Sequence, residues 1–338
     1  MENNMTFEEF CKEVAERLPE YCDGLDRSQV VLKNVTKAND TKLTGICVKK
    51  EGFNISPAFY LERSFDEYQN GMSVNDVMME LRDTVEKELS KITQDFDVSF
   101  VNTFDSAKER LSCKLINGKA NAEYLKDKPS EKFHDLAVVY ILKVDAPGHG
   151  DENVIDSIAV TNSLMDSWGV TKEDLHSAMM ENLAKEEISV KTLRGTLMEM
   201  GTAFLGETLP EISEPEISEP YVLTNKNAIF GAIAILRDDI MQKISEKMGG
   251  DYWIIPSSVH ECLIMPKTFG TLHELNDMVR SVNATEVKQE EQLSDHVYEY
   301  NSVDKRVVNP MEADGRSNEQ ILDMNTPEAA AVRRHRAR

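Results

Sequence analysis

The stretch DYWIIPSSVHECLIMP, residues 251–266, places an apolar segment on each side of a short polar one. Apolar runs of this length predict β-strands, and the sequence Pro-Ser-Ser is typical of a turn. The stretch therefore predicts two strands joined by a hairpin-length connection. Because parallel strands need crossovers of about a dozen residues or more, a sheet built from such pairs is not purely parallel.

Segments on the N-terminal side extend this pattern with further strands and with helices. QVVLKNVTK (29–37) and LTGICVKK (43–50) predict two strands joined by a turn, and DLAVVYILKV (135–144) predicts a strand buried on both faces. A helix is predicted from Ser73, because apolar residues recur at positions 74, 77, 78, 81, 85 and 89. We therefore expect an α/β or α+β protein with mixed β-sheets flanked by helices.

The length of the chain predicts more than one module. At 338 residues it fits two domains, since domains commonly contain about 100–200 residues. We expect two closely packed α/β modules, at 1–150 and 151–301. The second would carry an acidic loop at 209–220, where the pentapeptide EISEP occurs twice in tandem. Residues 302–338 lack hydrophobic periodicity and are predicted to form a disordered tail.

Composition narrows the possible partners and the compartment. The chain has 60 acidic and 38 basic residues and a formal charge of −22, which argues against binding nucleic acid or an anionic membrane surface. Its five cysteines are scattered and predict no disulfide framework. The N-terminus lacks the layout of a signal peptide, and no apolar run approaches the ~20 residues of a membrane span. We expect a cytoplasmic protein whose partner is another protein or a second copy of itself.

The polar part of the opening stretch raises the question of catalysis. Ser258, His260 and Glu261 are the residue types of a hydrolytic site. In a strand, however, Ser258 and His260 would share one face and Glu261 would point to the other. The glycines of a nucleophile elbow are also missing. A turn between two strands explains the same residues, so both interpretations remain open.

Metal binding is a second hypothesis for this region. His260 and Glu261 are followed by His273 and, further on, by His296, all of them residue types that ligate zinc or iron. The spacing is not that of H-E-x-x-H, and Glu274 next to His273 is explained by the start of a helix. A metal site would require these residues to converge in the fold.

Other motifs favour no cofactor. PGHGDEN (147–153) contains G-x-G without a third glycine, and the chain has no Walker lysine motif, so we expect no nucleotide cofactor. His134 lies beside an apolar run and is interpreted as a structural residue. Cys113 and Cys262 occur in apolar strands, where cysteine commonly acts as a small hydrophobic residue.

Five segments, taken together and in order, resemble a known family. They are PAFYLERSFDEYQNGMSVNDVMMEL (57–81), TNSLMDSWGVTKEDL (161–175), YVLTNKNAIFGAIAIL (221–236), DYWIIPSSVHECLIMP (251–266) and LNDMVRSVNATEVKQEEQLSDHVYEY (275–300). The set resembles an uncharacterised domain-of-unknown-function family of anaerobic Gram-positive gut bacteria, often encoded near mobile elements. The resemblance implies no activity, cofactor or catalytic residue.

These observations support two expectations for function. The first is a non-enzymatic accessory or protein-interaction protein, possibly of mobile-element origin, whose acidic surface favours basic partners. The second is a hydrolase or metal-dependent enzyme centred on His260 and Glu261. The two differ in whether the polar side chains around His260 converge on one another.

Overall fold

The computed structural model describes residues 5–313 except 55, 94, 96, 145–155 and 206–218. Contacts within the chain group it into two compact units whose segments alternate along the sequence. Unit 1 comprises 1–111, 120–128 and 141–178, and unit 2 comprises 112–119, 129–140 and 179–338. The module boundary predicted at residue 150, the whole PGHGDEN segment and most of the EISEP loop lie outside the described residues.

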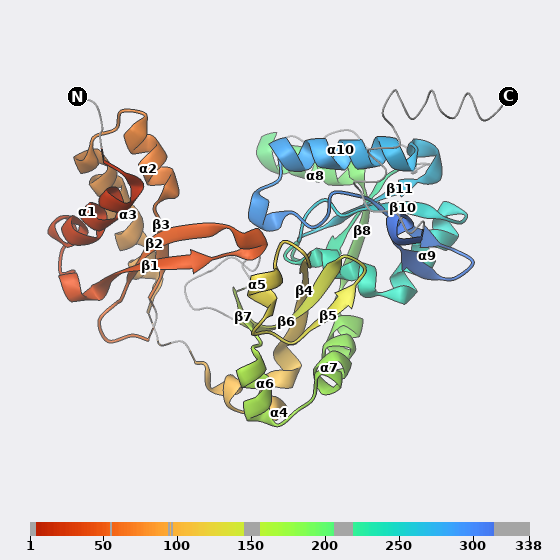
Figure 1. Ribbon diagram of the computed structural model, residues 1–338, viewed down its shortest axis with the longest axis horizontal. Coiled ribbons are helices and arrows are strands. Elements are labelled where there is room, and N and C mark those ends of the chain that lie inside the picture. Colours follow the sequence, from red (N-terminus) through yellow and green to blue (C-terminus); the bar gives the residue numbers. More distant parts are fainter. Residues whose placement is uncertain are drawn as a thin grey trace, which may run out of the picture. The chain divides into compact units, whose positions relative to one another are not determined.

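Unit 1 contains a three-stranded antiparallel sheet in the order β1-β2-β3, with helices packed against it (Figure 1). The apolar faces of α1, α2 and α3 meet β2 and β3 in one buried core that includes Phe10, Ile46 and Met78. The strands are β1 (Val30–Thr36), β2 (Lys42–Val48), β3 (Ala58–Tyr60) and β7 (Asp156–Ala159). The helices are α1 (Phe7–Tyr21), α2 (Glu62–Gln69), α3 (Val74–Lys91), α4 (Phe104–Ala107), α5 (Ala122–Leu125) and α6 (Asn162–Trp168).

Unit 2 contains a six-stranded sheet in the order β13-β12-β10-β11-β9-β8, in which neighbouring strands run antiparallel. The strands are β8 (Ile188–Thr192), β9 (Tyr221–Asn225), β10 (Tyr252–Ile255), β11 (Cys262–Pro266), β12 (Tyr298–Asn301) and β13 (Arg306–Val308). Strands β4 (Leu111–Asn117), β5 (Ser130–Phe133) and β6 (Leu136–Val144) form another sheet, and β7 pairs with residues 141–144 of β6.

In the sequence, the helices of unit 2 lie before, between and after the strands of the larger sheet. They are the second half of α7 (Lys172–Lys185), α8 (Leu193–Leu205), α9 (Asp238–Met248), α10 (Leu272–Thr285) and α11 (Pro310–Ala313). Helix α10 packs on β10 and β11, where Leu275 and Val279 contact the buried side chains of Trp253 and Ile255. A capping box of Thr271 and Glu274 begins this helix.

Several local predictions are confirmed. The fold class is α+β, and the 251–266 stretch forms the antiparallel pair β10–β11 with Tyr252 opposite Pro266. Ser73 caps α3, as predicted. Strand β6 is buried along nearly its whole length, as its continuous apolar sequence predicted.

The predicted start of the disordered tail requires a correction. Residues 302–313 are ordered, because β13 pairs with β12 across a turn at 302–305 and α11 follows directly. Short strands of this kind carry little periodicity, so the sequence alone does not reveal them. Residues 314–338 lie outside the described part of the chain.

Candidate functional site

A two-residue turn joins β5 to β6 and carries His134 and Asp135. Phe133 pairs with Leu136, so these two residues form the whole connection. His134 has a φ of 55°, a left-handed conformation that tight hairpin turns require and that side-chain-bearing residues seldom adopt. The amide of Gly118 donates to the carbonyl of Asp135 at 2.9 Å, which brings the end of β4 against the turn.

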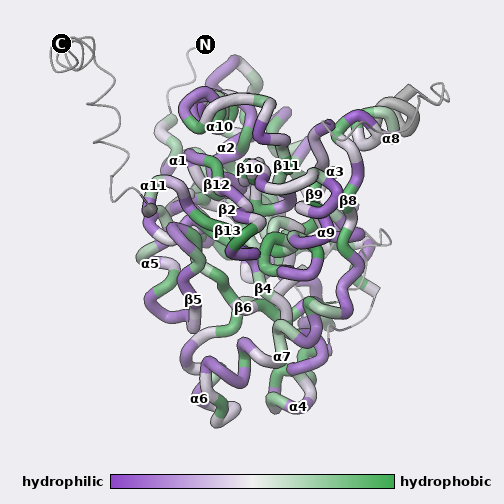
Figure 2. Tube along the Cα trace, turned by 90° about the vertical axis from the view of Figure 1, so that its right-hand side faces the viewer, coloured by the Kyte–Doolittle hydropathy of each residue, from purple (hydrophilic) through white to green (hydrophobic). Residues whose placement is uncertain are grey.

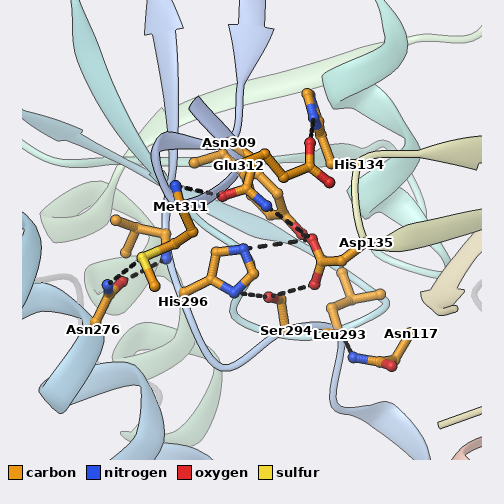
Figure 3. Close-up of polar contacts among 12 residues, drawn as sticks. Asn117, His134, Asp135, Asn276, Leu293, Ser294, His296, Asn309, Met311 and Glu312 are labelled. Carbon is orange, nitrogen blue, oxygen red and sulfur yellow. Dashed lines mark hydrogen bonds and ion pairs between the residues drawn. The ribbon is translucent and has the colours of Figure 1, made fainter. Parts of the chain in front are cut away.

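The Asp135 carboxylate lies at the centre of a polar network in unit 2 (Figure 3). The Tyr298 hydroxyl donates to Oδ1 at 2.6 Å, and the Ser294 hydroxyl donates to Oδ2 at 3.2 Å. The Asn309 amide reaches Oδ1 at 3.5 Å, and Nε2 of His296 lies 3.4 Å from the same oxygen. Side chains from the segment before β12, from β12 itself and from the segment after β13 thus converge on one carboxylate.

His296 and Ser294 are buried beside this carboxylate. Nδ1 of His296 lies 2.9 Å from the Ser294 hydroxyl, and the ring stands beside that of Tyr298. The residue types match a hydrolytic triad, but the geometry does not. In a triad the imidazole separates the serine from the acid, whereas here Ser294 contacts both His296 and Asp135. Ser294 is also only 2% exposed, so a substrate has no access to its hydroxyl.

The network sets the ionisation of its members. Burial raises the pKa of Asp135, but the contacts with His296 and Tyr298 outweigh it and hold the pKa below the usual aspartate value. Burial, together with the neighbouring Asp135 charge, raises the pKa of Tyr298 well above that of a free tyrosine. Asp135 is therefore held as an acceptor and Tyr298 as a donor, which is the pairing that their hydrogen bond requires.

The other residue of the turn, His134, contacts the C-terminal elements. Its Nδ1 lies 3.1 Å from Oε2 of Glu312, and its Nε2 lies 3.2 Å from the carbonyl of Val307. Glu312 belongs to α11 and Val307 to β13. The turn thus contacts both elements of the segment that the sequence predicted to be disordered.

The loop between β10 and β11 contains the sequence-predicted catalytic residues. The Ser258 hydroxyl accepts a hydrogen bond from the backbone amide of His260 at 3.1 Å, and the Ser258 amide donates to the carbonyl of Glu261 at 3.2 Å. The contact between Ser258 and His260 is therefore a local turn and does not involve the imidazole. The backbone amide of Phe230 donates to Nδ1 of His260 at 3.3 Å, and the two rings stack 5.8 Å apart.

The bond from Phe230 decides the tautomer of His260. A ring nitrogen that accepts a hydrogen bond carries no proton, so the neutral imidazole keeps its proton on Nε2. Nε2 faces Glu291, whose Oε1 lies 4.0 Å away. Neither ring nitrogen is then free to take a proton from a serine. This arrangement favours a structural role for His260.

The backbone beside His260 is strained. Ala228 and Phe230 both have positive φ, 52° and 53°, and a bulky residue in this region is uncommon. The Asn225 side chain holds the connection, because it accepts from the amide of Ile229 at 3.2 Å and donates to the carbonyl of the same residue at 2.8 Å. The bond from Phe230 to His260 adds a second restraint.

The candidate metal ligands contact separate partners. His260 and His296 lie in the two sites described above, and His273 lies on the exposed face of α10, 3.4 Å from Asp277. Among the described residues, no three His, Cys, Asp or Glu side chains are grouped as a metal site would require. Glu261 is placed in the β10–β11 loop, where its backbone carbonyl makes the turn contact with Ser258.

A third feature is an apolar pocket beside the last strand of the six-stranded sheet. Helix α8 begins directly after β8, and the Thr192 hydroxyl accepts from the amide of Gly195 at 3.0 Å. Figure 2 shows α8 well away from α10, although the two overlap in Figure 1. A pocket of about 430 Å³ is lined by Leu193, Arg194, Leu197, Met198, Glu219 and Pro220. The Leu197 side chain on its wall is 59% exposed.

Described charged side chains of β8, β9, α8 and the residues flanking them occur as pairs of opposite sign. The distances between their charged atoms are 2.7 Å for Lys191–Glu199, 3.5 Å for Lys226–Glu187 and 3.9 Å for Arg194–Glu219. Among the described residues beside the pocket, Lys191 and Arg194 balance Glu199 and Glu219, in a chain whose formal charge is −22. We call the surface formed by β8, residues 193–199 of α8, and Glu219 and Pro220 the β8–α8 surface.

Comparison with known families identifies the chain. The profile of a family of unknown function, DUF5688, matches residues 7–302. The chain belongs to this family. A search of curated proteins found no match, and a search of solved structures found none either. Within the described residues of this DUF5688 protein, no helix is both long and apolar enough to cross a membrane.

The candidate sites of this DUF5688 protein were only partly visible in its sequence. Sequence reasoning singled out Ser258 and His260, which lie in one loop, and His296, which lies in the Asp135 network. It missed Asp135 itself and Leu197. The two polar residues between the alternating segment SEKF and the apolar segment LAVVYILKV are a signal for a hairpin turn, and this signal could have located Asp135.

Proposed function

We propose that this DUF5688 protein is a protein-interaction protein without an enzymatic activity of its own, and that it binds its partner through the β8–α8 surface. The observation that carries this proposal is the apolar pocket on that surface, with Leu197 exposed on its wall. A single exposed leucine is ordinary, but an exposed leucine on a concave apolar surface is typical of a binding site.

The charge distribution supports the same surface. A chain with a formal charge of −22 repels acidic proteins over most approaches. Among its described residues, the β8–α8 surface carries equal numbers of acidic and basic side chains, so this repulsion is reduced there. Rim residues of opposite sign around an apolar centre are the usual anatomy of a protein–protein interface.

The geometry of the polar candidates supports a role without catalysis. Nδ1 of His260 accepts a backbone hydrogen bond, and the Ser258 hydroxyl is engaged with a backbone amide. Ser294 and His296 are buried. All five cysteines are free, which fits a reducing compartment and supports a cytoplasmic location.

Site-specific photo-crosslinking tests the proposal. A photoreactive amino acid is introduced at Leu197 in the full chain, expressed in its native cell, and the crosslinked protein is identified and purified. The same residue introduced at Val303, which is 87% exposed in the turn between β12 and β13, is the matched control. We expect a specific crosslinked protein from position 197 and none from position 303.

Binding measurements with the purified partner then test whether Leu197 lies in the interface. With the identified partner in purified form, Leu197→Asp should weaken binding at least about tenfold, because it places a charge in an apolar contact, whereas Val303→Asp should leave binding unchanged. Equal crosslinking from both positions, or equal affinity of the two variants, would overturn the proposal.

A further inference from the structure

Strand β8 pairs with β9 on one side. This pairing determines which backbone groups of β8 point to its opposite, outer side. The amide of Leu193 donates to the carbonyl of Pro220, and the amide of Lys226 donates to the carbonyl of Glu187. Residues of an antiparallel strand alternate in the direction of their backbone groups. The odd-numbered residues of β8 therefore bond to β9, and the amides and carbonyls of Ile188 and Val190 point away from it.

This outer side of β8 is an open edge. Strand β8 ends the order of the six-stranded sheet, and no described strand pairs with its outer side. Unpaired backbone groups in a row form a template for another strand, which proteins commonly cover or use for association. The edge lies next to the start of α8, and Leu197 follows one helical turn after Leu193.

We infer that the partner at the β8–α8 surface is a second copy of this chain, whose β8 pairs antiparallel with β8 of the first copy across a two-fold axis. This inference rests on the proposed function, since it names the partner for the same surface. The two-fold axis passes beside Ser189. Ile188 of each copy then lies opposite Val190 of the other, and the outward-facing backbone groups of these two residues form the hydrogen bonds.

The charge pattern favours this register. With Ile188 opposite Val190, Glu187 of each copy lies opposite Lys191 of the other, which gives two cross-strand pairs of opposite charge. A register centred on Val190 would instead place Lys191 opposite Ser189. Both charged side chains are exposed, 74% for Glu187 and 51% for Lys191, so their ion pairs within one copy are weak enough to be exchanged.

The local charge balance favours a second copy of the chain as the partner at the β8–α8 surface. Two chains that each carry a charge of −22 repel one another wherever acidic surfaces meet. Each described acidic residue of the β8–α8 surface has a basic counterpart, and a two-fold axis brings the same described surface to itself. Such a self-complementary contact is what a symmetric dimer requires.

Sedimentation velocity of the purified full chain tests the inference. We expect the wild-type chain to form a species of twice the monomer mass in a concentration-dependent manner. Val190→Pro should abolish this species, because it removes an outward amide that the ladder to β9 does not use. Unchanged circular dichroism would show that the Val190→Pro chain is still folded.

A charge exchange tests the register. Lys191→Glu should weaken the dimer about tenfold, because it creates two like-charge pairs across the axis, and Glu187→Lys combined with Lys191→Glu should restore it. Lys305→Glu changes the net charge equally but lies in the turn between β12 and β13, outside the pairing, so it should weaken the dimer far less. A dimer that tolerates Val190→Pro, or a double variant as weak as the single one, would overturn the inference.

The outcome also separates this inference from the proposed function. A wild-type chain that stays monomeric, but crosslinks from position 197 to a different protein, overturns the self-pairing and leaves the interaction role in place. A monomeric chain without a specific crosslink overturns both.

Discussion

The hydroxyl of Tyr298 donates a hydrogen bond to the carboxylate of Asp135 at 2.6 Å, although 163 positions separate the two residues in the chain. Tyr298 is the first residue of β12, and Asp135 lies in the turn between β5 and β6. This bond therefore ties a hairpin turn to the six-stranded sheet of unit 2. Its energetic role can be measured separately from that of the neighbouring apolar contacts.

Tyr298→Phe should lower the free energy of unfolding by about 1.5 kcal/mol, because it leaves a half-buried carboxylate without its shortest hydrogen bond. Urea unfolding followed by circular dichroism measures this change. The control is Tyr300→Phe, since the Tyr300 hydroxyl is buried and has no hydrogen-bond partner among the described residues. That variant should be neutral or slightly stabilising, and equal losses in the two variants would contradict the assignment.

The stability that Asp135 contributes should depend on pH. Its contacts with His296 and Tyr298 lower the pKa of the folded state, so its contribution is present above the unfolded pKa of about 3.9 and is lost as the pH falls through the folded value. Asp135→Asn should thus cost most near neutral pH and progressively less in acid. Urea unfolding of both chains from about pH 7 to about pH 3 measures the difference.

A surface carboxylate provides the control for this experiment. Asp304 is exposed and pairs with Arg306 at 3.4 Å. Because exposed ion pairs contribute at most about 1 kcal/mol, Asp304→Asn should differ little from wild type at any pH. A difference between Asp135→Asn and wild type that stays constant through the acid range would contradict the role assigned to Asp135.

The structural role of His260 predicts a graded response to substitution. His260→Leu should lower the free energy of unfolding by about 2 kcal/mol, because the amide of Phe230 loses its acceptor and the rings no longer stack. His260→Asn should cost less, since its side-chain oxygen can replace Nδ1 as the acceptor. Thermal unfolding compares the two variants, and equal losses would show that the hydrogen bond is unimportant.

Gly231 should tolerate no side chain. A Cβ atom there would lie 2.6 Å from both the amide nitrogen of Asn225 and the carbonyl oxygen of His260. Both atoms belong to the backbone and cannot move aside, so Gly231→Ala should cost about 3 kcal/mol or more. Gly24→Ala is the control, because Gly24 has a φ of 76° with open space around it and should cost about 1 kcal/mol. Chemical denaturation measures both, and a smaller loss at Gly231 than at Gly24 would contradict the packing.

Local features of the fold followed from local patterns. The helix starting at Ser73, the hairpin β10–β11 and the buried strand β6 were each predicted, because capping, turn chemistry and continuous apolar sequence act between residues close in the chain. Strands β8 and β13 were missed. Each is short and only partly buried, so periodicity carries little signal for it, and the pairing partner of β8 lies about thirty positions further along the chain.

In the candidate sites too, local residue patterns were visible in the sequence, whereas contacts between distant residues were not. The residue types of the 256–261 segment suggested catalysis, but the expected strand alternation does not apply, because the segment forms the loop between β10 and β11. Only the structure shows that Phe230, thirty positions away, fixes the tautomer of His260. Likewise nothing near Asp135 in the sequence indicates that His296 and Tyr298 converge on it.

By itself the sequence determined that helices and sheets are both present, that a helix begins at Ser73 and that residues 251–266 form a hairpin, because these features depend on side chains that interact with nearby backbone. It also determined the formal charge of −22. That the sheets are antiparallel and the class is α+β was left open by the sequence and decided by the tertiary structure. The tertiary structure decided which polar groups meet, since the Asp135 network joins segments more than 150 positions apart. It also decided that Leu197 and the outer edge of β8 remain uncovered in the described chain, because exposure depends on every element that does or does not pack against them.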